Sequence, residues 1–335
     1  MSPSRLKVAL LAGGRSSEHE ISLTSARSVL EALDPGEYDV VTVAIGRDGR
    51  WELGSGDGSV AETLPVPAAN APATLGSVDV VLPILHGPFG EDGTVQGLLE
   101  LAGVPYVGAG VAASALCMDK DLFKKVLRDS GIAVARHVAL REGDAVHNPF
   151  GFPCFVKPAR LGSSVGITKA HDEDELQRAA ELAFRHDDKI LVEEFMDGIE
   201  VEVGVLGNRD PIASIPGQIV PLGHEWYDYA SKYDEGGMDL LVPPPDLPEH
   251  VLEHVQRSAI EAFLVTECEG MARADCFVVD GDRVVVNELN TIPGFTSTSV
   301  YAKLFEASGI AYGELLRRLI ELALERHERR SKLQY

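Results

Sequence analysis

The sequence is short of positive charge. It has 30 lysines and arginines against 52 aspartates and glutamates, which gives a formal net charge of −22. This balance argues against broad, non-specific binding to nucleic acid or to anionic membranes. A small anion such as a nucleotide is still compatible with it, because a few lysines in a pocket outweigh a distant surface field.

The sequence also lacks a membrane-length apolar run, a signal peptide and paired cysteines. No apolar run approaches the length that crosses a bilayer, and the first five residues lead directly into an expected strand. None of the four cysteines lies in a Cys-x-x-Cys motif, so we expect reduced thiols in a cytoplasmic protein. At 335 residues, with 45% hydrophobic and 24% charged residues, the chain is typical of a globular protein of two or three domains.

Strands and helices alternate along the chain, which favours an α/β fold. We expect a parallel-sheet domain in residues 1–115, a central region in 116–194 and a third region in 195–335. Expected strands cover 6–12, 38–45, 78–82, 105–107, 155–157 and 189–194, and expected helices cover 20–33, 119–129, 172–184, 249–267 and 312–326. Residues 54–73, rich in Gly, Pro, Ala and Ser, predict a loop.

Three oxygen-bearing side chains can converge on one face of a predicted hairpin in the third region. Glu288 and Asn290 lie two residues apart on one strand, so their side chains leave the same face. Asp275 lies on the preceding strand, which a turn at 280–282 would fold back alongside. Mg²⁺ takes one or two carboxylates plus substrate phosphates, and Arg273 shares this face. The set predicts a metal site for phosphoryl transfer, although either carboxylate alone could belong to a solvated strand edge.

A Gly-Ser loop after Lys157 predicts a second phosphate contact. Lys157 ends a strand and precedes the segment 162–166, where glycines let backbone N–H groups approach an anion. This is not a Walker loop, and alone it could be a flexible hairpin. Lys120 could be a second phosphate-reaching amine. Further on, the backbone edge beside Phe195 and Met196 could hold an adenine, with Glu200 on a ribose.

Seven motifs, in this order along the chain, are shared with one known family: residues 13–23, 86–93, 118–120, 157–166, 227–233, 273–275 and 287–299. In these segments the chain resembles the D-alanine–D-alanine ligases of the ATP-grasp superfamily over essentially its full length. The resemblance implies an ATP-grasp fold in which a Rossmann-like domain precedes two domains that clasp ATP. It also implies that ATP phosphorylates one D-alanine and that the amine of a second attacks the D-alanyl phosphate, which makes dipeptide for peptidoglycan. A homodimer with two Mg²⁺ or Mn²⁺ ions is implied as well.

The resemblance assigns nucleotide and metal roles to individual residues. Asp275, Glu288 and Asn290 would hold the metal ions. The residues expected to contact ATP are Lys120, Lys157, Gly162, Ser163, Ser164, Val165, Glu193, Glu194, Phe195, Met196, Glu200, Lys232, Asn287 and Glu288. Leu161 replaces a residue that is often acidic in the phosphate loop of relatives.

The resemblance also assigns the amino-acid site. Glu20 would bind the ammonium of the first D-alanine, and His86 would line the same site. Arg273 and the N–H of Gly294 would stabilise the tetrahedral intermediate. Ser299 and the N–H of Val300 would hold the carboxylate of the second D-alanine.

One loop is implied to close over this site. Glu20, Ser163 and Tyr233 would form a hydrogen-bonded bridge that holds the loop 225–236 shut and excludes water from the acyl phosphate. Ligases that use D-lactate often have His at the position of Tyr233, so tyrosine predicts an amine nucleophile.

Other functions stay open from the sequence. A carboxylate–amine ligase of the same superfamily could use D-serine, D-lactate or another acceptor. The segment from His250 to His254 matches the His-x-x-Glu-His signature of inverted zinc proteases, although no third ligand is evident nearby. The N-terminal sheet could belong to a non-catalytic nucleotide-binding protein, but it lacks the Gly-x-Gly-x-x-Gly fingerprint.

Overall fold

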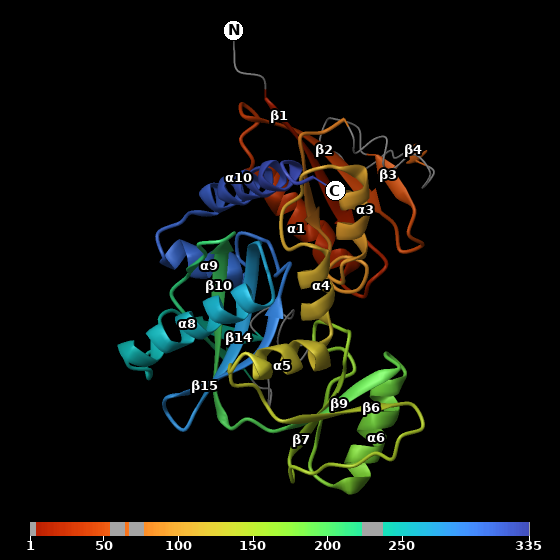
Figure 1. Cartoon of the computed structure of the whole chain (residues 1–335), viewed down its shortest axis with the longest axis vertical. Helices are drawn as coiled ribbons and strands as arrows, with labels where there is room; N and C mark the ends of the chain where they lie inside the picture. The colour runs from red at the N-terminus through yellow and green to blue at the C-terminus, as the bar shows by residue number, and fades with distance from the viewer. Residues whose placement is uncertain (1–4, 54–63, 67–76, 223–236, 335) are drawn as a thin grey trace.

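The computed structural model describes residues 5–53, 64–66, 77–222 and 237–334 and contains three β-sheets (Figure 1). The sheets follow one another along the chain, and helices pack against each of them. The alternation of strands and helices predicted from the sequence is therefore confirmed. Within the described residues, no helix is long and apolar enough to cross a membrane.

The first sheet has five strands in the order β4-β3-β2-β1-β5, and its core is parallel. The residues from Val8 to Leu11 are almost fully buried, as expected of a parallel strand covered on both faces. The elements of this part are β1 (Leu6–Gly13), α1 (His19–Ala32), β2 (Tyr38–Ile45), β3 (Trp51–Leu53), β4 (Leu64–Val66), β5 (Val80–Ile84), α3 (Thr94–Ala102) and α4 (Val111–Met118).

Two expectations about the first sheet are wrong. The predicted strand at 105–107 forms only an isolated bridge, in which Tyr106 pairs with Val81. The segment is held to β5 by two hydrogen bonds, from the N–H of Val81 to Pro105 at 2.8 Å and from the N–H of Val107 to Val81 at 2.9 Å, so it continues the parallel sheet as a single bridge and not as a strand. The predicted loop at 54–73 contains the strand β4, which pairs with β3 at the edge of the sheet.

The second sheet is antiparallel, in the order β6-β9-β7-β8. Helix α6 starts where predicted because Asp172 caps it by accepting a hydrogen bond of 2.8 Å from the N–H of Glu175. The elements are α5 (Lys120–Asp129), β6 (His137–Arg141), β7 (Cys154–Pro158), β8 (Thr168–Ala170), α6 (Glu173–Phe184) and β9 (Lys189–Glu194).

The third sheet runs β13-β12-β10-β14-β15, with β11 beside β10. The predicted hairpin is confirmed: β14 and β15 pair antiparallel, and Asp280 and Gly281 turn the chain with φ values of 56° and 90°. The elements are β10 (Gly198–Gly207), β11 (Ile212–Ala213), β12 (Gly217–Pro221), β13 (Met238–Leu241), α8 (Glu249–Val265), β14 (Gly270–Val279), β15 (Arg283–Asn290) and α9 (Val300–Ala307).

The last helix, α10 (Tyr312–Ser331), returns to the start of the chain, and Figure 1 shows it in blue beside the red α1 and β1. Its apolar face, from Leu315 to Ala323, belongs to the same buried cluster as Val8 and Leu82 of the first sheet. The buried guanidinium of Arg326 donates to the carbonyl oxygens of Tyr106 and Gly108. The predicted third region is thus not spatially separate from the first.

Candidate active site

Two adjoining cavities lie where the three sheets approach one another. The first, of about 430 Å³, is lined mainly by the second and third sheets, and the second, of about 480 Å³, lies between the first domain and the third sheet. Gly162, Ser163 and Glu288 line both cavities. A group bound in one cavity can therefore reach a group bound in the other across this shared wall.

Lysines line the first cavity near the shared wall. Lys157, at the end of β7, lies 2.5 Å from Glu193 Oε1. Lys120 opens α5, donates to the carbonyl of Leu161 at 2.8 Å and lies 3.3 Å from Glu288 Oε2. The side chain at position 161 is not used in this contact, so the replacement by leucine leaves it intact. These ammonium groups are suited to binding phosphates.

The loop that follows Lys157 has an unusual backbone. Ser163 and Ser164 have φ values of 53° and 57°, in the left-handed region that few residues other than glycine adopt. Gly166 has a φ of 72°, and a Cβ there would lie 2.7 Å from His186 Cδ2. Consecutive residues of this kind expose backbone N–H groups that can bind an anion. The loop predicted from glycine and serine is therefore compatible with phosphate binding.

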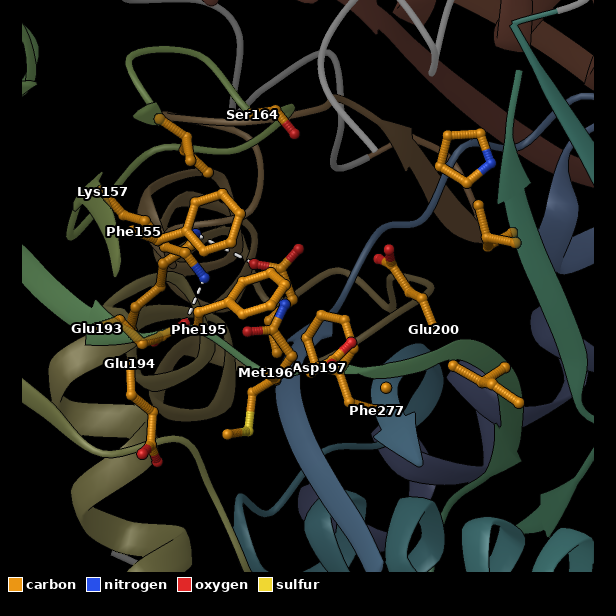
Figure 2. Close-up of a pocket in the computed structure, with 18 of the residues that line it drawn as sticks. Phe155, Lys157, Ser164, Glu193, Glu194, Phe195, Met196, Asp197, Glu200 and Phe277 are labelled. Carbon is orange, nitrogen blue, oxygen red and sulfur yellow. Dashed lines mark hydrogen bonds and ion pairs between the residues drawn. The ribbon is translucent and has the colours of Figure 1, made fainter. Parts of the chain in front are cut away.

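Aromatic side chains also line the first cavity (Figure 2). The ring centroids of Phe155 and Phe195 are 6.2 Å apart, and Lys169 Nζ lies 4.3 Å from the centroid of Phe195. Phe277 also lines the cavity, although the sequence analysis did not identify it. Arg273, Asp275 and Phe277 are spaced two residues apart on β14, so their side chains leave the same face of the strand. This spacing is the signal that could have identified Phe277.

One predicted nucleotide residue points away from this cavity. Figure 2 shows the side chain of Glu194 directed away from the rings. Its Oε2 accepts from Arg136 Nε at 2.6 Å, and its Oε1 accepts from the backbone N–H of Arg136 at 2.7 Å. Glu194 lines the cavity as predicted, but because Arg136 holds its carboxylate, its contact with a nucleotide would be made through the backbone. Glu200, by contrast, extends its carboxylate toward the cavity as predicted.

The predicted metal ligands lie together on β14 and β15. Asp275 and Glu288 are cross-strand partners, and Asn290 Nδ2 donates to Asp275 Oδ2 at 3.0 Å. Arg273 binds Asp275 with both Nε and Nη2 at 2.7 Å, and its Nε also lies 3.0 Å from Glu202 Oε2 on β10. Two carboxylates and an amide oxygen match the hard oxygen ligands of Mg²⁺. The donor set fits the metal provided that Arg273 gives up part of its hold on Asp275.

The zinc interpretation does not fit. His250 and His254 lie on α8 as the motif requires, but both side chains are exposed on its solvent face. Among the described residues, no three His, Cys, Asp or Glu side chains come together in a way that could hold a metal ion. The two histidines are the polar start of a surface helix.

The acid that contacts the Gly-Ser loop is Glu18 and not Glu20. Ser163 Oγ donates a short hydrogen bond to Glu18 Oε1, and Glu18 is buried just before α1. Glu20 also borders the second cavity, but its side chain is 74% exposed and lies 3.2 Å from Arg47. The predicted bridge from Glu20 to Ser163 is therefore wrong, because the first helical turn directs Glu20 outward. The position of Glu18 at the helix N-terminus was the available signal.

His86 and a second buried acid, Glu91, also line the second cavity. His86 Nδ1 lies 3.0 Å from the carbonyl of Ile292, so Nδ1 carries a proton, and burial lowers the pKa of this histidine. Glu91, which the sequence analysis missed, accepts from the N–H groups of Gly87 at 2.9 Å and Ile292 at 3.1 Å. Burial raises the pKa of Glu91 to about 8. Both side chains tie the segment after β15 to the first domain.

That segment carries the other predicted contacts. Gly294, Ser299 and Val300 all line the second cavity, and Val300 begins α9. Ser299 Oγ accepts from the N–H of Thr296 at 2.9 Å. The free N–H groups at the start of α9 favour an anion there. Lys232, Tyr233 and the rest of the loop 225–236 lie outside the described residues.

Comparisons with known proteins agree over nearly the whole chain. The model described as "D-ala D-ala ligase N-terminus" matches residues 7–109, and the model "D-ala D-ala ligase C-terminus" matches residues 126–321. A D-alanine–D-alanine ligase of Solibacter usitatus is 47% identical over 331 residues, which cover 97% of this chain and 98% of the relative. A D-Ala:D-Ser ligase from Enterococcus faecalis gives a TM-score of 0.85 at 34% identity, covering 96% of this chain and all of its own. The D-alanine–D-alanine ligase from Bacillus anthracis complexed with ATP gives 0.79 at 28% identity, covering 97% and 99%.

Proposed function

The chain belongs to the D-alanine–D-alanine ligase family, and from this premise we propose how its own residues perform the reaction. It is an ATP-grasp enzyme that joins two D-alanines to D-alanyl-D-alanine at the expense of ATP, in the synthesis of peptidoglycan precursors. The observation that supports the residue assignment best is the wall shared by the two cavities. ATP in the first cavity and D-alanine in the second would meet across it.

In the first step of the reaction ATP phosphorylates the carboxylate of one D-alanine, and we assign the ATP to the first cavity. Its base would lie among Phe195, Met196 and Phe277, and its phosphates would extend past Lys157 and Lys120 to the Gly-Ser loop. Bringing a carboxylate to a triphosphate concentrates negative charge, and the two lysines offset part of it. The residues predicted for the nucleotide keep their roles in the proposal, with Glu194 acting through its backbone.

The first D-alanine would lie in the second cavity with its ammonium on Glu18. This carboxylate is buried and already accepts from Ser163, so it is held in one orientation. Its hydrogen bond also links the amino-acid site to the phosphate loop. Glu18 therefore takes the role that the sequence analysis gave to Glu20.

In the second step, the amine of another D-alanine attacks the acyl phosphate, and charge develops on one oxygen. Arg273 and the N–H of Gly294 are assigned to that oxygen, and losing one such donor typically costs about a hundred-fold to a thousand-fold in rate. Ser299 and the N–H of Val300 would bind the carboxylate of the second substrate at the start of α9.

Asp275, Glu288 and Asn290 would hold one or two Mg²⁺ or Mn²⁺ ions, which when bound would neutralise charge on the phosphates. Arg273 donates a hydrogen bond to each carboxylate oxygen of Asp275, so at least one of these two bonds must break when Asp275 binds a metal ion. Glu202, 3.0 Å from Arg273 Nε, is a second anchor for the guanidinium. The arginine can thus turn toward the reacting oxygen without losing all its support.

The remaining assignments stay predictions. The boundaries 1–115, 116–194 and 195–335 each enclose one sheet, apart from the return of α10 to the first. Closure of the loop 225–236 by Tyr233, the homodimer and the cytoplasmic location are carried forward from the family resemblance.

The main alternative function differs in the second substrate: a structural relative at 34% identity is a D-Ala:D-Ser ligase. Purified protein is incubated with ATP, Mg²⁺ and a panel of D- and L-amino acids plus D-lactate, and phosphate release and product mass are measured. We expect D-alanine alone to release phosphate and give the mass of its dipeptide. A preference for D-serine or D-lactate over D-alanine would overturn the assignment of the second site, and phosphate release that is independent of D-alanine would overturn the assignment of both cavities.

A further inference from the structure

A fully buried lysine lies between the two walls of the nucleotide cavity and has no part in the steps above. Lys124 is on α5, one turn after Lys120, and none of its surface is exposed. It does not line the cavity. Burying an ammonium group is costly unless it is paired and hydrogen-bonded, so its partners indicate why it is there.

The partners of Lys124 come from both walls of the cavity. Its Nζ lies 3.0 Å from Glu193 Oε2 on β9, and it donates to the carbonyl of Asn287 on β15 at 2.9 Å. The amide oxygen of Asn287 lies 3.4 Å away. The two contacts with Asn287 are hydrogen bonds and the contact with Glu193 is an ion pair, so the buried ammonium group is satisfied by protein groups. Lys124 therefore acts through its neighbours and not on a ligand.

On the β9 wall, Lys124 fixes the pair made by Glu193 and Lys157. Glu193 accepts from Lys157 on its other oxygen, Oε1, and Lys157 lines the cavity. Burial would raise the pKa of Glu193, but the ammonium groups of Lys124 and Lys157 outweigh burial and bring this pKa down to about 2. The carboxylate stays ionised between two lysines, and it sets where Lys157 points.

On the β15 wall, Lys124 supports a β-bulge beside the predicted metal ligands. Asp275 pairs with Glu288, but the next residue of β14, Cys276, pairs with Val286. Asn287 is therefore the extra residue of the bulge, where the ladder of hydrogen bonds is interrupted. Lys124 donates to the carbonyl of this residue, next to Glu288. A bulge re-aims the side chains around it, so Lys124 helps to set the direction of Glu288.

We propose that Lys124 is a positioning residue that joins β9 to the bulge of β15, so that Lys157 and Glu288 meet the same nucleotide from opposite walls. The inference rests on the proposed nucleotide role of this cavity. A lysine on an amphipathic helix is ordinarily a solvated surface residue. Lys125 is one, with a side chain 57% exposed, whereas its neighbour Lys124 is fully buried.

The test compares Lys124→Met with the matched control Lys125→Met. Methionine keeps the length of the side chain but removes the charge and the donors. We expect Lys124→Met to weaken ADP binding, measured by calorimetry, and to raise KM for ATP by about tenfold or more, as for a lost charged hydrogen bond. KM for D-alanine at saturating ATP should stay within about twofold, and Lys125→Met should resemble the wild type in both substrates, because the Lys125 side chain is exposed and does not line the cavity.

A second variant guards against misfolding. Lys124→Gln keeps an N–H donor for Asn287 but not the charge beside Glu193, and it should also weaken ADP binding. A purely structural role would lower the unfolding temperature without separating the two KM values, and that result would overturn the inference. Wild-type affinity for ADP in either folded variant would overturn it as well. If the wild type itself binds no ADP, the proposed function fails instead.

Discussion

Replacing Glu18 or Glu20 with glutamine distinguishes the two acids at the start of α1. Glu18 is 7% exposed and accepts from Ser163, whereas the side chain of Glu20 is 74% exposed and pairs with Arg47. A hydrogen bond to a charged group contributes about 1.5–3 kcal/mol, and each 1.4 kcal/mol is about tenfold. Glu18→Gln should therefore lower kcat/KM for D-alanine by about ten- to a hundred-fold.

Glu20→Gln serves as the control in the same assay. An exposed ion pair contributes about 1 kcal/mol at most, so its loss should cost less than about fivefold. Initial rates of phosphate release at varied D-alanine and saturating ATP give both values, and circular dichroism checks that the variants are folded. A larger loss in Glu20→Gln than in Glu18→Gln would refute the assignment of the ammonium site to Glu18.

Three further predictions concern the third sheet and the buried acid of the nucleotide cavity. Arg273→Ala should slow turnover by about a hundred-fold or more while changing the ATP dissociation constant less than about tenfold, and equal losses would mean that Arg273 only anchors the nucleotide. Asp275→Asn should raise the Mg²⁺ concentration for half-maximal phosphate release by about tenfold, and an unchanged Mg²⁺ titration would remove Asp275 from the metal site. The pKa of Glu193 is lowered from 4.5 to about 2, so its charge stabilises the fold fully above pH 4.5 and this contribution is lost as the pH falls toward 2. Glu193→Gln should flatten the fall in unfolding free energy, measured with urea, over that pH window, and a wild-type slope in the variant would contradict the pairing.

The sequence predicts the parts of the site that depend on local geometry. Glu288 and Asn290 share a face because side chains alternate along a strand, and the turn at 280–282 brings Asp275 opposite. A Gly-Ser loop after a strand that carries Lys157 is likewise predicted from adjacent residues, and the structure has this loop after β7 with left-handed backbone at Ser163 and Ser164. Its binding of phosphate stays a prediction.

Contacts between distant segments are where the prediction falls short. Lys124 lies in a charged helix and reads as a solvated residue, yet its partner Asn287 is 163 residues away. The bulge at Asn287 arises from the register between two strands, which no single strand encodes. Glu18 and Glu20 are the same residue type two positions apart, and only their places at the start of α1 decide that Glu18 is buried against Ser163 while Glu20 is exposed.

The packing of α10 against the first sheet has a consequence for how the protein is made. The helix was predicted from its amphipathic pattern, but the sheet that it covers includes β1, which is synthesised long before it. Leu315, Leu316 and Leu319 complete the core around Val8, so that core cannot close until synthesis has passed residue 319. The core of the first domain therefore stays incomplete until α10 has been synthesised. An N-terminal fragment expressed alone would expose this apolar face, and the enzyme is best regarded as one folding unit whose first and last segments mature together.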